Sequence, residues 1–418
     1  MHVPDGFINA PVSVAAGVAA AGAVALSLRG ARRELGAGSA QGGQGAHGGE
    51  GVAAERTAPL AGLVAAFIFA VQMLNFPVAA GTSGHLLGGA LAAILVGPYT
   101  GVLCVSVVLL MQGVLFADGG LTALGVNILV MGVVTVLVAY GIFRLLLRVL
   151  PRRRSSVTGA SFAAALVSVP AAAVAFTGIY ALGGTADVAL GKVFAAMVGV
   201  HVLIGLGEAA ITAATVGAVI AVRPDLVHGA REFATRKLEL RTTAVAAPGG
   251  GTVPAAESGA VAGAGSSGAD AGADSGSVAG ERPAAPVPVA APRTDRRVWL
   301  GGLAAALLCA GVISFYASAS PDGLEKVAAD NGIDKQVEDH AAKDSPLADY
   351  GIKDIADTRL SGGLAGVIGV GATLAVGSGV FVAVRRRRAE GEGAVTANSP
   401  VTAGTSGQGT DAGDHKAV

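Results

Sequence analysis

The second residue of the chain is a histidine, which gives the N-terminus the chemistry of a metal chelator. In the opening run MHVPDGF, the α-amine of Met1 and the backbone amide nitrogen of His2 can close a five-membered chelate ring. The same amide nitrogen and the imidazole Nδ1 of His2 can close a six-membered ring. The three nitrogens then lie in one plane, which suits Ni(II) and similar late transition metals. Because the amine must lose a proton to bind, affinity should rise with pH.

Taken alone, His2 is better explained as an accidental residue at a frayed terminus, and a second histidine changes that balance. His85 ends the run GTSGH that begins at residue 81. We expect it at the start of a short helix, on the same side of the membrane as Met1, where it can supply a fourth nitrogen. Hydrogen bonds that orient the ligands are expected from nearby polar side chains. These are Asn75, Thr82 and Ser83.

Three ionisable residues are weaker candidates for the site. His201 and Glu208 are seven residues apart in an apolar segment, so they share one face of a helix. They are interpreted either as a relay for metal or protons, or as a packing pair or partner contact. Asp118 begins the turn Asp118-Gly119-Gly120, where its carboxylate can attract cations or cap the turn.

The elements that carry these residues are predicted to cross a membrane. Hydrophobic residues make up 52% of the 418 positions and charged residues only 14%, against about 25% charged in average domains. A membrane span needs about 20 apolar residues. We therefore predict an all-α polytopic membrane protein with seven spans before a linker and two after it. They cover residues 10–28, 60–76, 85–97, 100–116, 121–147, 160–182, 190–222, 298–316 and 362–384.

The third of these segments is too short to span the membrane and is expected to begin below its surface, as half-helices that line a site do. Clusters of Lys and Arg follow the first, fifth, seventh and ninth segments and precede the eighth. Such residues prefer the cytoplasm. The pattern therefore predicts a multi-pass protein of the cell membrane with an exterior N-terminus and a cytoplasmic C-terminus.

Composition divides the chain into four parts. Residues 1–240 hold the first membrane block, which is interrupted by a Gly/Ser/Gln-rich insert at 36–51. Residues 241–297 are predicted to be a flexible cytoplasmic linker, since they contain too few large apolar residues to form a core. Residues 298–388 hold the second block, with a polar exterior loop between its two spans. Residues 389–418 are expected to be a disordered tail.

The motifs MHVPDGF, NFPVAAGTSGHLLGGALAAILVGP and FADGGLTALGVNIL closely resemble the CbiM/NikM family. These proteins are the substrate-capture components of cobalt and nickel energy-coupling-factor (ECF) transporters. The resemblance covers about residues 1–240, apart from the insert. It implies that the amine of Met1, the amide and imidazole of His2, and His85 hold the metal.

The second block begins its polar loop with ASASPDGLE, residues 317–325, and resembles the PDGLE domain, which is akin in role to CbiN/NikN. The resemblance implies that the chain works with a transmembrane coupling protein and cytoplasmic ATPase subunits, as part of an ECF-type ABC importer. It also implies Co²⁺ or Ni²⁺ as substrate, with no prosthetic group. If cobalt is carried, it would supply cobalamin biosynthesis. Both metals remain open at this point.

Several other functions are disfavoured by what the sequence contains. The formal net charge is zero, whereas nucleic-acid binding requires a basic face. The sequence has no phosphate-binding G-x-x-x-x-G-K-[ST] loop, so we expect no ATPase or other enzymatic activity in this chain. An alternative is an autonomous proton-coupled secondary carrier that uses His201 and Glu208. An intramembrane metalloenzyme is a further alternative, but it would need a base beside a metal-bound water.

Overall fold

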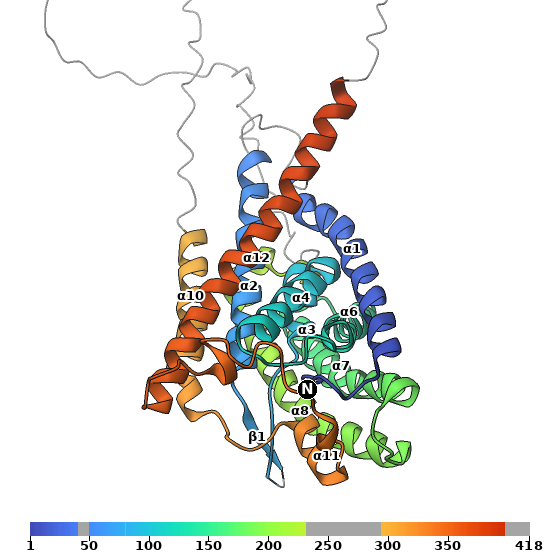
Figure 1. The fold of residues 1–418 in the computed structure, drawn as a ribbon. Helices are drawn as coiled ribbons and strands as arrows, with labels where there is room; N and C mark the ends of the chain where they lie inside the picture. The colour runs from blue at the N-terminus through green and yellow to red at the C-terminus, as the bar shows by residue number, and fades with distance from the viewer. Residues whose placement is uncertain (41–49, 80, 231–293, 398–418) are drawn as a thin grey trace, which may run out of the picture. The chain divides into compact units, whose positions relative to one another are not determined.

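The computed structural model describes residues 1–40, 50–79, 81–230 and 294–397, and these are almost entirely helical (Figure 1). The described residues before and after the gap at 231–293 fall within one compact unit. The long helices before the gap are α1 (Ala10–Ala40), α2 (Glu50–Gln72), α4 (Pro98–Leu115), α6 (Thr135–Val149), α7 (Arg154–Gly183) and α8 (Leu190–Val222). After the gap come α10 (Thr294–Gly311), the short α11 (Gly323–Asn331) and α12 (Thr358–Ala397).

The prediction of a polytopic membrane protein is confirmed. Among the described residues, seven helices are long and apolar enough to cross a membrane. Each lies on one of the nine predicted segments: 10–35, 98–115, 124–149, 154–183, 190–222, 298–316 and 358–385. The second predicted segment contains a shorter apolar helix, Pro59–Gln72.

The third predicted segment differs most from expectation. Just before it, β1 (Phe76–Ala79) and β2 (Thr82–Gly84) pair as a small antiparallel hairpin, and α3 begins only at Gly89 and ends at Val96. His85 therefore lies in the connection before the helix, and the prediction that it begins the helix is wrong. The reason is local, because Gly88 takes a positive φ of 79° at the N-cap of α3, which favours glycine.

Two segments expected to lack fixed structure are partly helical. In the insert at 36–51, α1 extends to Ala40 and α2 begins at Glu50. The tail expected to be disordered from 389 instead continues α12 to Ala397. The rest of the insert and tail, and the linker up to residue 293, lie outside the described residues.

The fifth predicted span is continuous but not uniform. It consists of α5 (Leu124–Asn127), a π-helical stretch (Ile128–Val134) and α6. π-Helical turns within α-helices are frequent at functional sites. This one begins beside Asn127, a buried residue that binds the N-terminal segment.

The helices after the gap pack directly against the helices of the first block. Helix α12 runs along α2, and α11 lies against α8 (Figure 1). A glycine at the start of α11 makes the second contact possible. A Cβ on Gly323 would lie 2.8 Å from Val200 Cγ1 and 3.0 Å from Ile204 Cδ1, both on α8. The loop between α10 and α12 is thereby placed next to the chain's N-terminus.

Candidate metal-capture site

The N-terminal segment is buried and held by backbone hydrogen bonds. Val3 is fully buried, and its N–H donates to Asn127 Oδ1 at 2.8 Å. Its carbonyl accepts from Asn127 Nδ2 at 3.1 Å and from the Gly120 N–H at 2.9 Å. A side-chain amide that satisfies both groups of one residue fixes the segment as a strand partner would. The hydrogen bonds of Val3 therefore help to fix the position of Met1 and His2.

A second anchor lies at Asp5. Its buried carboxylate accepts hydrogen bonds from the backbone N–H groups of Leu121 and Thr122 and from the Thr122 hydroxyl. Its carbonyl accepts from the N–H of Glu338, in the C-terminal loop. The first five residues are thus fixed between the 117–124 connection and the C-terminal region.

The α-amine of Met1 lies 2.6 Å from His85 Nε2 and 2.6 Å from Asp322 Oδ2. His85 Nδ1 is 2.8 Å from the carbonyl oxygen of Leu86. Since a carbonyl only accepts, Nδ1 carries the proton and Nε2 has a free lone pair directed at the amine. Burial, followed by the positive charge of the amine, lowers the pKa of His85. A neutral imidazole with a free Nε2 is the form that binds a metal.

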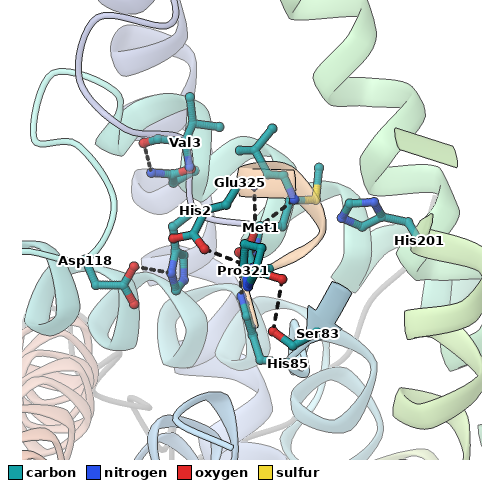
Figure 2. Close-up of polar contacts among 12 residues, drawn as sticks. Met1, His2, Val3, Ser83, His85, Asp118, His201, Pro321 and Glu325 are labelled. Atoms are coloured by element: carbon teal, nitrogen blue, oxygen red, sulfur yellow. Dashed lines mark hydrogen bonds and ion pairs between the residues drawn. The ribbon is translucent and has the colours of Figure 1, made fainter. Parts of the chain in front are cut away.

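The imidazole of His2 stacks on that of His85, with ring centroids 4.9 Å apart and planes at 25° (Figure 2). His2 Nδ1 lies 2.6 Å from Asp118 Oδ1, and Tyr350 donates its hydroxyl to Asp118 Oδ2 at 2.6 Å. Burial alone would raise the pKa of Asp118, but the charge of His2 and these hydrogen bonds hold it at about 2. Among the described residues, the buried Nε2 of His2 has no hydrogen-bond partner.

The structure gives Asp118 contacts that we did not predict. Its carboxylate joins His2 to Tyr350 of the C-terminal loop. It also directs His2 Nδ1 away from the chelating position predicted for it, because the Nδ1 proton is donated to the carboxylate.

Two of the three residues predicted to support the ligands, Asn75 and Ser83, hydrogen-bond to the C-terminal loop. The backbone N–H of Ser83 donates to the carbonyl of Pro321 at 2.8 Å. The hydroxyl of Ser83 donates to the backbone carbonyl of Ser320 at 2.7 Å. The carbonyl of Asn75 accepts from the Ser318 N–H at 2.7 Å. Thr82 is buried in β2. The hairpin thus forms the dock on which residues 318–321 lie.

Residues 321–325, Pro-Asp-Gly-Leu-Glu, form the N-terminus of α11. Asp322 Oδ1 accepts from the N–H groups of Leu324 and Glu325, and the Glu325 side chain accepts from the Asp322 N–H. This reciprocal arrangement is a capping box. Its consequence is that Asp322 Oδ1 is occupied by the helix while Oδ2 is left to bind the Met1 amine.

His201 and Glu208 are both fully buried but do different things. Glu208 accepts the N–H groups of Leu87 at 2.7 Å and Gly88 at 3.1 Å, just before α3. His201 Nδ1 lies 2.7 Å from the Met197 carbonyl, and Figure 2 places its ring near Met1. Among the described residues, the buried Nε2 of His201 has no hydrogen-bond partner. The two side chains are therefore not paired with each other.

A cavity of about 780 Å³ opens onto the cluster from the side of the C-terminal loop. His2, His85, Asp118 and Asp322 line it, together with the further carboxylates of Glu325, Asp334 and Asp349. In the described part of the chain, no group of three or more His, Cys, Asp or Glu side chains is arranged to hold a metal.

Four residues of the cluster were not predicted as site residues: Asp322, Tyr350, Asn127 and Asp5. For Asp322 a local signal existed, because Asp followed three residues later by Glu indicates a capping box. That signal predicts a helix start but not a contact with the amine 321 positions away. For the other three, neither spacing nor composition indicated the contacts that they make.

Taken together, the spans and the buried amine–imidazole cluster define a multi-pass membrane protein with a nitrogen-rich site at its N-terminus. The family described as the cobalt uptake substrate-specific transmembrane region, CbiM, matches residues 2–226, more than half of the chain, and the PDGLE domain matches residues 296–386. The chain belongs to the CbiM family and carries a PDGLE domain behind it.

Curated proteins similar to this chain are described as metal transport proteins. A putative metal transport protein of Haloquadratum walsbyi is 40% identical over 231 residues, which cover 54% of this chain and 93% of the relative. A putative fused nickel transport protein, NikMN, of Archaeoglobus fulgidus is 36% identical over 249 residues, 58% of this chain and 73% of the relative. A crystal structure of a truncated transition metal transporter aligns with 53% of this chain at 24% identity and a TM-score of 0.43.

Proposed function

We propose that this chain captures a divalent transition-metal ion, Co²⁺ or Ni²⁺, as the substrate-binding membrane component of an ECF-type importer. The observation that carries the proposal is the placement of the Met1 amine 2.6 Å from His85 Nε2, with the ring of His2 stacked on that of His85. Two proposed ligands from distant parts of the sequence thus lie together, beside the cavity.

The proposed ligands are the Met1 amine, the amide nitrogen and Nδ1 of His2, and Nε2 of His85. Chelation through His2 Nδ1 requires its ring to turn about the Cβ–Cγ bond, because Nδ1 faces Asp118 in the structure. A half-turn exchanges Nδ1 with Cδ2, and Nε2 with Cε1. The proton-bearing Nε2 would then lie on the Asp118 side, so the carboxylate can keep its hydrogen bond.

One feature supports an importer component rather than an autonomous carrier. Glu208, half of the proposed proton relay, is committed to the backbone N–H groups ahead of α3. We propose that energy comes from a transmembrane coupling protein and cytoplasmic ATPase subunits. We also propose a location in the plasma membrane, with the N-terminus exterior and the C-terminus cytoplasmic.

Metal binding by purified full-length protein tests the site. Calorimetric titration with Ni²⁺ and with Co²⁺ should show that His85→Ala loses binding. The control His340→Ala should retain it, because His340 is not a proposed ligand and its Nε2 lies on the Gly119 carbonyl, at 3.2 Å. Binding by His85→Ala equal to that of the unmodified protein would refute the site. Uptake that continues without ATPase partners and follows a proton gradient would instead favour the carrier.

A further inference from the structure

The α-amine and the two imidazoles that are proposed as ligands each have a hydrogen-bond acceptor beside them. His85 Nδ1 donates to the Leu86 carbonyl, and His2 is bonded to Asp118. The Met1 amine donates to Asp322 Oδ2 at 2.6 Å. Acceptors of this kind orient metal ligands and increase their basicity. Asp322, the acceptor for the amine, belongs to the PDGLE domain, whereas Leu86 and Asp118 belong to the CbiM region.

Asp322 is held rigidly by contacts on every side. Its Oδ1 is bonded to two backbone N–H groups of α11, and the preceding Pro321 carbonyl accepts from Ser83. The next residue, Gly323, allows α11 to approach α8, where a Cβ would lie 3.3 Å from His201 Cε1. A carboxylate fixed in this way holds the amine at a defined point rather than following it.

An amine bound to a metal through its lone pair still has N–H bonds to donate. The hydrogen bond to Asp322 can therefore persist while the amine binds the ion. Asp322 Oδ2 is 3.6 Å from His85 Nε2, so it lies on the border of the cluster, beside both nitrogens. Its negative charge also offsets part of the charge of the cation.

We infer that Asp322 is a positioning residue for metal capture, which holds the Met1 amine in the place where it binds the ion. The PDGLE domain thereby completes the capture site from outside the CbiM region. This inference rests on the proposed function, because it requires the amine to be a ligand. It predicts that metal affinity depends on a residue that itself need not touch the metal.

Asp322→Asn tests the inference without removing the helix cap, since Asn caps helices as well as Asp does. The side-chain oxygen can still receive the N–H groups of α11, while the NH₂ group cannot accept from the amine. Asp330→Asn is the matched control, because the change of charge is identical and Asp330 lies at an exposed position of the same helix, paired with Lys326. Full-length proteins that begin at Met1 would be titrated with Ni²⁺ alone.

We expect the Kd of Asp322→Asn for Ni²⁺ to rise by about 10–100-fold, the range found for partners of metal ligands, and that of Asp330→Asn to be unchanged. The visible absorption of Ni²⁺ bound to Asp322→Asn should also shift, because the amine no longer lies in the ligand plane. A purely structural defect would reduce the amount of folded protein and leave that band in place. If Asp322→Asn does not purify as folded protein, Asp322→Ser retains a capping hydroxyl and should give the same result.

Two results would overturn the inference. Unchanged affinity and absorption in Asp322→Asn would show that the amine is placed without this carboxylate, and tighter binding would show that Asp322 competes with the ion. His85→Ala is measured in parallel to separate the two claims. If it loses binding while Asp322→Asn does not, only the role of Asp322 fails. If both bind like the unmodified protein, the capture site itself is wrong.

Discussion

The carboxylate of Glu208, in the middle of α8, accepts the backbone N–H of Leu87 at 2.7 Å. The N–H of Gly88 binds its other oxygen, so the two residues that follow Leu86 are fixed by a helix more than a hundred positions away. His85 is held at the other end of this connection, with Nδ1 on the Leu86 carbonyl. Helix α8, which holds the two residues of our relay hypothesis, therefore serves to position the proposed ligand His85.

Replacing Glu208 by Gln should destabilise the protein. Gln keeps one acceptor oxygen but turns an NH₂ group toward a buried backbone N–H, which leaves donors unpaired. The loss should be about 1–3 kcal/mol, seen as a lower melting temperature in detergent. Asp330→Asn, at an exposed position on α11, is the control and should melt like the unmodified protein. An unchanged melting temperature for Glu208→Gln would show that the two hydrogen bonds add little.

Replacing Gly323 by Ala should weaken metal binding. An added Cβ would approach Val200 Cγ1 to 2.8 Å and push α11, with Asp322, away from α8. Helix propensity acts in the opposite direction, since Ala in a helix is favoured over Gly by about 0.5–1 kcal/mol. Gly371→Ala, in α12, meets no atom within 4 Å and is the matched control. Equal Ni²⁺ affinity of the two variants would contradict this account of α11 docking.

Replacing Asp118 by Ala should reduce Ni²⁺ affinity by about 10–100-fold, because His2 would lose the acceptor that orients its ring. Tyr350→Phe should have a smaller effect in the same direction. It removes the hydrogen bond to Asp118 Oδ2 but leaves Oδ1 on His2. Calorimetric titration of the two variants measures this order. A larger loss from Tyr350→Phe than from Asp118→Ala would show that the Tyr350 hydroxyl acts by another route.

The spans were predictable because a chain in lipid must satisfy its backbone hydrogen bonds within helices and must be apolar over their length. The pairing of His2 with His85 was predictable in outline, from two histidines expected on one side of the membrane and from the family resemblance. The residue at which α3 begins was not predictable. It depends on Glu208 and on the positive φ of Gly88, which no periodicity in residues 85–97 indicates.

Which residue of the PDGLE domain contacts the site was also beyond sequence reasoning. The motif predicts a helix cap, but a cap says nothing about what the free carboxylate oxygen binds. In the structure, the hairpin of β1 and β2 receives residues 318–321, and that docking brings Asp322 to the amine. Contacts of such long range depend on tertiary packing.

The most direct test of the account is the metal content of full-length protein that begins at Met1, compared with the same protein carrying one extra residue before Met1. Intact mass confirms each terminus, and mass spectrometry measures cobalt and nickel after growth with both metals available. We predict near-stoichiometric metal in the first protein, which identifies the ion, and its loss in the second, because the amine has moved away from His85. Equal metal in the two proteins would contradict the claim that the N-terminal amine binds the substrate ion.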